Sequence, residues 1–150
     1  MIENQLQIRS AERSDLASIL ELYRQLHPRD PSVSLDEAER VWQEFLGYSG
    51  SAIFLGLKDN ALVTSCTLVV IPNLTRGGLP YALIENVITD ARHRKRGYGR
   101  EILKAATAAA WKLDCYKVML LTGSEDLATL AFYKSAGFHQ SKTGFQIRRA

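Results

Sequence analysis

Several features that mark particular protein classes are absent from this sequence of 150 residues. Cysteine is scarce: Cys66 and Cys115 are the only two, and neither has partners at the spacing of a zinc site, so we expect reduced thiols and no metal. No apolar run approaches the roughly 20 residues of a membrane span. The start lacks the basic patch and apolar segment of a secretory leader. We therefore expect a cytoplasmic protein with no membrane partner.

A large excess of charge of one sign is also absent, since 19 basic and 16 acidic residues leave a net charge of only +3. The distribution is uneven, because five cations fall within nine positions: Arg92, Arg94, Lys95, Arg96 and Arg100. Such a cluster suits nucleic acid, a membrane surface or a phosphorylated ligand. The cluster is short, and Tyr98 is the one aromatic side chain that could stack on bases. We therefore expect no nucleic-acid partner and favour a small ligand that carries phosphates.

No internal repeat, low-complexity tract or linker divides the chain, which predicts one domain over residues 1–150. Periodicity predicts strands at residues 6–10, 52–57, 61–71, 81–89, 116–121 and 145–148. It predicts four helices: one from residue 14 or 15 to before His27, one that Ser34 caps, one after residue 99, and one at 125–135. The predicted order is β-α-α-β-β-β-α-β-α-β-β, an α/β mixture with seven strands, of which the first of the two after the last helix has no assigned bounds.

The segment from Thr89 to the third helix has the chemistry of an anion site. A helix N-terminus presents unpaired N–H groups, and the glycines Gly97 and Gly99 let a backbone approach a ligand closely. A dinucleotide-binding fingerprint needs a third glycine or an alanine, and Ile102 stands there instead. The Gly-Lys-Ser/Thr of a nucleotide-hydrolase phosphate loop is absent as well.

The pattern Arg94-x-x-Gly97-x-Gly99 matches the Gln/Arg-x-x-Gly-x-Gly/Ala signature of the GNAT N-acetyltransferase superfamily. Some thirty residues later, residues 132–138 contain a Phe-Tyr pair followed by Gly-Phe, as the family does. The chain therefore resembles this superfamily, most specifically over residues 81–138. The resemblance implies a single GNAT-like domain whose central mixed sheet has about seven strands, flanked by four helices. It also implies acetyl-CoA as co-substrate and suggests a homodimer.

The resemblance implies where the cofactor lies. It assigns the backbone of Val87, Ile88 and Thr89 to the pantetheine arm and thioester carbonyl, and the amides of residues 95–100 to the pyrophosphate. Asp126 occupies a position at the last helix where many members have Asn. The cofactor-binding residues so implied are Val87, Ile88, Thr89, Arg94, Lys95, Arg96, Gly97, Tyr98, Gly99, Arg100 and Asp126.

Two side chains are candidates for the chemistry. Tyr133 matches the family's acid position, and a phenol with a pKa near 10 stays protonated at pH 7 and can donate to a departing thiolate. The alternative is that Tyr133 only packs its helix onto the sheet. Glu85 interrupts an apolar strand and is the candidate base, with a structural hydrogen bond or an acceptor-binding role as alternatives.

The acceptor side is less specified, and its candidate residues are His27, Asp30, Arg76 and Asn86. Residues 84–87, 115–117 and 132–134 together resemble glucosamine-6-phosphate N-acetyltransferases. Those enzymes usually have Glu-Asp where this chain has Glu85-Asn86, and an acidic residue where it has Leu121. We therefore expect acetyl transfer to a primary amine of a small molecule. An enzyme specific for glucosamine 6-phosphate and a non-catalytic acetyl-CoA sensor are the alternatives.

Overall fold

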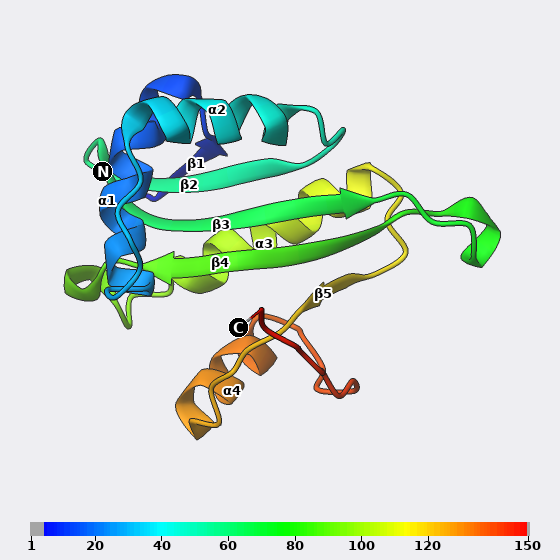
Figure 1. The fold of residues 1–150 in the computed structure, drawn as a ribbon. Helices are drawn as coiled ribbons and strands as arrows, with labels where there is room; N and C mark the ends of the chain where they lie inside the picture. Colours follow the sequence, from blue (N-terminus) through cyan, green and yellow to red (C-terminus); the bar gives the residue numbers. More distant parts are fainter. Residues whose placement is uncertain (1–4, 150) are drawn as a thin grey trace.

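The computed structural model describes residues 5–149. Its strands and helices follow one another in the order shown in Figure 1. They are β1 (Gln7–Ser10), α1 (Leu16–Leu26), α2 (Leu35–Leu46), β2 (Ala52–Lys58), β3 (Ala61–Ile71), β4 (Tyr81–Thr89), α3 (Tyr98–Lys112), β5 (Val118–Leu120) and α4 (Leu127–Ser135). Single turns of 3-10 helix lie at Arg13–Asp15, Arg76–Gly78 and Ala91–His93. As predicted, Ser34 caps α2, and its hydroxyl accepts from the N–H of Glu37 at 3.2 Å.

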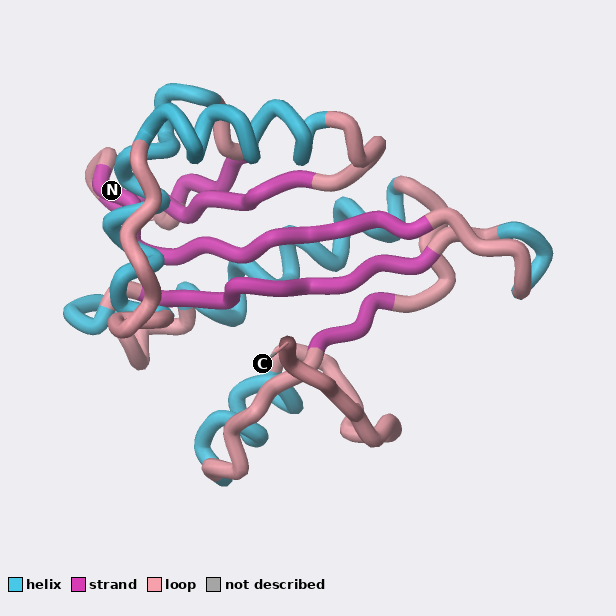
Figure 2. Tube along the Cα trace, viewed as in Figure 1, coloured by secondary structure: helices cyan, strands magenta, loops and turns pink. Residues whose placement is uncertain are grey.

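Among residues 5–149 the sheet has five strands in the order β1-β2-β3-β4-β5, so the prediction of about seven strands is wrong. The first four strands pair antiparallel, and β5 joins β4 in parallel. Residues 145–148 form no strand; Phe145 is 93% exposed and Ile147 is 99% exposed. Within residues 5–149 this segment pairs with no strand and is drawn as loop in Figure 2; a preference for strand yields a strand only when the segment pairs and packs.

Helices cover both faces of the sheet, with α3 behind it and α1 in front of it (Figure 1). On the α3 face, Cys66 and Leu68 of β3 pack with Ile102 and Leu103 in a fully buried core. On the other face, Thr67 meets α1, where its Oγ1 lies 3.4 Å from the Tyr23 hydroxyl. None of the helices within residues 5–149 combines the length and apolar character that crossing a bilayer requires.

Strand β4 contains a β-bulge opposite Cys66 of β3. Ser65 pairs with Ile88 and Thr67 with Glu85, so two β4 residues, Asn86 and Val87, lie opposite one residue of β3. Asn86 takes a left-handed backbone (φ 52°), which asparagine tolerates better than most residues. The pairing of β5 covers only Ala82–Ile84 of β4. From Glu85 onward, the edge of β4 on the β5 side is therefore unpaired within residues 5–149, and the candidate site lies along this edge.

Candidate active site

The unpaired edge is the stretch of β4 from Glu85 to Thr89, where no strand lies on the β5 side in the described part of the chain. Ile88 turns its carbonyl to the β3 side, where it accepts from the Thr64 hydroxyl at 3.0 Å. Backbone groups alternate in direction along a strand. Val87 and Thr89 are therefore the residues whose backbone groups face the open edge. In agreement, the Thr89 carbonyl accepts from Nε of Arg94 at 3.2 Å.

A row of free N–H groups lies where β4 leads into α3. Within residues 5–149, the amides of residues 95–100 donate no hydrogen bond to the protein. The first donor of the helix is Glu101, whose N–H bonds to the Gly97 carbonyl at 3.0 Å. The helix dipole adds positive potential at this end. The arrangement can hold an anionic group, as the sequence indicates.

The two glycines of the turn do different work. Gly97 has φ 85°, a left-handed conformation that glycine adopts without strain, and the nearest atom to the position of a Cβ would be Nη2 of Arg100, at 4.0 Å. At Gly99 a Cβ would lie 2.9 Å from Cζ of Phe132 and 3.3 Å from Oγ1 of Thr89. Gly97 therefore shapes a ligand-facing turn, whereas Gly99 admits the ring of α4. Close approach of Phe132 is thus a further reason for a glycine at position 99, beside the predicted approach of a ligand.

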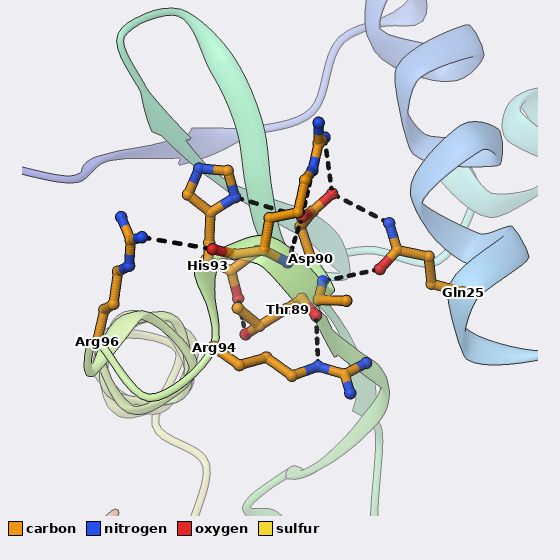
Figure 3. Close-up of polar contacts among 9 residues, drawn as sticks. Gln25, Thr89, Asp90, His93, Arg94 and Arg96 are labelled. Atoms are coloured by element: carbon orange, nitrogen blue, oxygen red, sulfur yellow. Dashed lines mark hydrogen bonds and ion pairs between the residues drawn. The ribbon is translucent and has the colours of Figure 1, made fainter.

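Side chains of the turn are only partly free. Arg94 holds the Thr89 carbonyl, and Arg96 reaches the Arg92 carbonyl at 3.4 Å (Figure 3). Tyr98 is 8% exposed and packs with Leu6 and Val63, so its ring belongs to the core. Among the described residues, Lys95 and Arg100 are the exposed cations of the turn that form no hydrogen bond or ion pair through their side chains.

Tyr133 lies half-buried on α4 against the main core and near the bulge. Burial raises the pKa of its phenol, and the neighbouring Cys66 and Glu85 raise it further. The group is therefore protonated throughout the neutral range, as a proton donor must be. Glu85 is exposed on β4. Its carboxylate is therefore solvated although the strand is largely apolar, because β4 loses its β5 neighbour at this residue.

The chain matches known acetyltransferases over most of its length. The profile described as "Acetyltransferase (GNAT) family" matches residues 16–138. The chain belongs to the GNAT acetyltransferase family.

Individual relatives agree with this assignment. A glucosamine 6-phosphate N-acetyltransferase of Trypanosoma brucei brucei is 29% identical over 133 residues, which are 89% of this chain and 88% of the relative. A solved structure from Agrobacterium tumefaciens str. C58, described provisionally as an acetyltransferase, is 48% identical, with a TM-score of 0.91 over 95% of this chain and 99% of that chain. An aminoglycoside N-acetyltransferase in complex with CoA shares the fold alone, at 18% identity and a TM-score of 0.81 over 97% and 95% of the two chains.

In this GNAT acetyltransferase the acceptor candidates do not all meet. His27 ends α1, and its carbonyl accepts from the N–H of Asp30 at 3.1 Å; both line a shallow hollow of about 260 Å³ with neighbouring residues of the α1–α2 loop. Arg76 belongs to the β3–β4 connection at the opposite end of the sheet, where its guanidinium lies 5.6 Å from the Tyr116 ring centre (Figure 1). His27 and Arg76 therefore do not share a site.

Asn86 and Asp126 each have a structural task. Asn86 occupies the left-handed position of the bulge and is exposed. Asp126 caps α4, and its Oδ1 accepts from the N–H of Ala128 at 3.1 Å. Within residues 5–149 no three potential ligand side chains group as a metal site would require.

Two polar groups near the site were not found from the sequence. Tyr23 stands in no sequence motif, yet its hydroxyl lies 3.4 Å from Oγ1 of Thr67 on β3, beside the bulge. Burial raises its pKa, while the polar groups of Thr67, Ser65 and Asn86 oppose that rise. Asp90 directly follows Thr89 and is 5% exposed. An aspartate that ends a strand before a basic turn is the signal that could have revealed it.

Asp90 collects the hydrogen bonds of the turn around one carboxylate (Figure 3). Oδ1 accepts from the N–H of Arg92 at 2.9 Å and from its Nε at 3.1 Å, and Nδ1 of His93 lies 3.3 Å away. Oδ2 accepts from Nε2 of Gln25 at 3.0 Å. The Arg92 hydrogen bond, helped by Gln25 and His93, holds the pKa of Asp90 well below its usual range despite burial. The carboxylate therefore remains charged and fixes the start of the turn.

Proposed function

We propose that this enzyme transfers the acetyl group of acetyl-CoA to a primary amine of a small molecule by direct attack on the thioester. The observation that carries the proposal is the row of six free amides, residues 95–100, beside the unpaired edge of β4. Both features are made of backbone, and they lie next to each other because Thr89 ends the strand just before the turn. A ligand with a diphosphate at one end and an amide-containing arm at the other matches both.

The residues present fit such a ligand. Free N–H groups at a helix N-terminus are suited to phosphate oxygens, and Lys95 and Arg100 add positive charge there. The backbone groups of Val87 and Thr89 would pair with the amides of the pantetheine arm, as an added strand would. Of the three β4 residues expected to do this, Ile88 contributes its side chain to the core and its carbonyl to Thr64. Asp126 would act through the start of α4 rather than through its carboxylate, which already caps the helix.

The bound thioester supplies an acyl carbon that an amine can attack. The nitrogen needs a lone pair, so the ammonium proton must first be removed. Glu85 is exposed on β4 at the point where the edge opens, and it would take this proton directly or through water. As the C–N bond forms and the C–S bond breaks, Tyr133 would donate its proton to the departing sulfur. The acylated nitrogen then loses a second proton, which returns to the Tyr133 phenolate directly or through water, so that the products are the amide, the CoA thiol and the one proton that Glu85 took from the ammonium.

Calorimetry with acetyl-CoA tests the cofactor half of the proposal; no binding at millimolar concentration would overturn it. An amine panel then follows release of the CoA thiol, with amino sugars, aminoglycosides, polyamines, amino acids and peptides as acceptors. Binding without thiol release on any amine would instead indicate a sensor. Glu85→Gln keeps the size of the side chain and should lower kcat at neutral pH, while the matched change Glu44→Gln on exposed α2 should not.

Glucosamine 6-phosphate is the second candidate acceptor. It is favoured by the Trypanosoma relative, which aligns with most of both chains, and opposed by Asn86 and Leu121 at positions where those enzymes usually have acids. A comparison of glucosamine 6-phosphate with glucosamine decides: specific use of the phosphorylated sugar requires a kcat/KM advantage of about 100-fold or more, the scale of a recognised charged group.

Two free cysteines within the described residues support a reducing, cytoplasmic location.

A further inference from the structure

Gln25 forms a two-point bridge between α1 and the segment that follows β4 (Figure 3). Its Nε2 donates to Oδ2 of Asp90 at 3.0 Å, and its Oε1 accepts from the N–H of Ala91 at 2.9 Å. One side chain thus supplies a donor and an acceptor to adjacent residues. A primary amide can do this, whereas a carboxylate has no donor and an ammonium has no acceptor.

On one side of the bridge lies the turn of residues 94–100, which holds the cofactor in the proposed function and is called the cofactor turn below. Asp90 is anchored to the sheet, because its N–H bonds to the Val63 carbonyl at 2.8 Å. Its carboxylate caps the Ala91–His93 turn through Arg92. The six free amides begin only five residues after Asp90. The position of Asp90 and Ala91 therefore influences the direction in which those amides point.

On the other side lies the hollow of the α1–α2 loop, which is lined by residues 26–30. Gln25 immediately precedes this segment. The N–H of His27 bonds to the Tyr23 carbonyl at 3.2 Å and closes the last turn of α1. The bridge thus holds the last turn of α1, and with it the start of the loop, against the segment that leads to the cofactor turn.

We propose that Gln25 is a positioning residue that couples the two segments, so that an anionic cofactor held at residues 95–100 orders residues 26–30 before the amine arrives. This inference rests on the proposed function, in which the turn holds CoA. Coupling between sites is reciprocal, so an amine held by residues 26–30 would also strengthen cofactor binding. The expected kinetic order is acetyl-CoA first and amine second.

Hydrogen exchange of the full chain with and without CoA tests the coupling without knowledge of the amine. In the parent protein, CoA should slow exchange in residues 95–100 and also in residues 26–30. Gln25→Leu should keep the first effect and lose most of the second, by about 5-fold or more, the lower end of typical couplings. The matched control is Gln43→Leu on exposed α2, which should behave as the parent.

A swapped pair separates positioning from stability. Gln25→Glu alone sets two carboxylates against each other and should lose the protection of residues 26–30. Gln25→Glu combined with Asp90→Asn restores a donor opposite an acceptor, and Glu still accepts from the N–H of Ala91, so protection should return. A thermal melt of each variant measures any general loss of stability. The melting temperatures of Gln43→Leu and the swapped pair are the references with which that of Gln25→Leu is compared. Once the amine is known, Gln25→Leu should raise its KM by about 5-fold, with kcat changed less than about 2-fold.

The outcomes distinguish the two proposals. If the parent binds no CoA, the proposed function and the inference both fail. If CoA protects residues 95–100 but leaves residues 26–30 unchanged, the cofactor site holds and the coupling is overturned. The coupling is also overturned if Gln25→Leu retains full protection of residues 26–30, or if the swapped pair fails to restore it.

Discussion

Replacement of Gly99 by alanine tests how the cofactor turn and α4 are joined. The added Cβ would lie 2.9 Å from Cζ and 3.2 Å from Cε2 of Phe132, and 3.3 Å from Oγ1 of Thr89. Contacts this close require the ring to move. Tyr133 is the next residue of α4 and shares a ring contact with Phe132, at 5.0 Å between centres. A shift of Phe132 therefore displaces the candidate acid as well.

Two effects of opposite sign set the magnitude. Overpacking of this kind costs about 1–3 kcal/mol, whereas alanine removes about 0.5–1 kcal/mol of the entropic cost of a glycine in a helix. The net loss of stability should be about 1–2 kcal/mol, with reduced turnover. In a Phe132→Leu background the clashing ring atoms are gone, so Gly99→Ala should become neutral or stabilising by up to about 1 kcal/mol.

Urea unfolding of the four proteins in this cycle gives the coupling energy directly. Gly97→Ala is the matched control, because its cost of about 1–2 kcal/mol comes from the left-handed backbone and should be the same in both backgrounds. A Gly99→Ala effect that agrees within about 0.5 kcal/mol in the two backgrounds would refute the reasoning.

Three further predictions concern titratable groups. Tyr133→Phe keeps the ring and should lower kcat by about 100-fold with CoA affinity unchanged; because the pKa of the phenol is raised, its ionisation should cause no loss of turnover below about pH 10. Asp90 has a lowered pKa, so its stabilisation is complete above about pH 4 and is lost as pH falls; Asp90→Asn should flatten this acid limb, and the control Asp36→Asn should not. Burial raises the pKa of Cys66 to about 12 and also raises that of Cys115, so Ellman's reagent at about pH 8 should label both thiols only after unfolding.

The first four strands were predictable, whereas the strands expected after α3 were predictable only in part. The bounds predicted for residues 61–71 and 81–89 are those of β3 and β4, because apolar runs between turns suffice to mark central strands. The predicted strand 116–121 shrinks to Val118–Leu120, since β5 leaves β4 at the bulge. The predicted strand 145–148 lacks any partner in the described part of the chain. The hydrophobic pattern of a segment indicates its preference for a strand, whereas strand pairing depends on which segment lies beside it in the fold.

The cofactor turn was recognisable because its parts are contiguous in sequence. Free amides, two glycines and cations all fall within a few residues of the start of α3. The Gln25–Asp90 contact was not recognisable, because it joins residues 65 apart and neither residue type is unusual where it stands. The packing of Phe132 against Gly99 shows a related limit: the signature located the glycine correctly, but the atom that requires it lies on α4.

The contrast between residues contiguous in sequence and residues brought together by the fold also indicates which residues select the amine substrate. Because α3 fills one face of the sheet behind β3 and β4, an amine must reach the open edge of β4 from the face that carries α1 (Figure 1). The groups already on that face are the Tyr23 hydroxyl with Thr67, and the loop that begins at His27. These come from the N-terminal part of the chain, outside residues 81–138, which carry the specific sequence signature. In the proposed function, the acetyl donor would be held by backbone geometry that a short signature encodes, whereas acceptor choice would depend on side chains of α1 and its loop. We therefore expect substitutions at Tyr23 and within residues 26–30 to change which amine is used, and substitutions within residues 94–100 to change affinity for every donor alike.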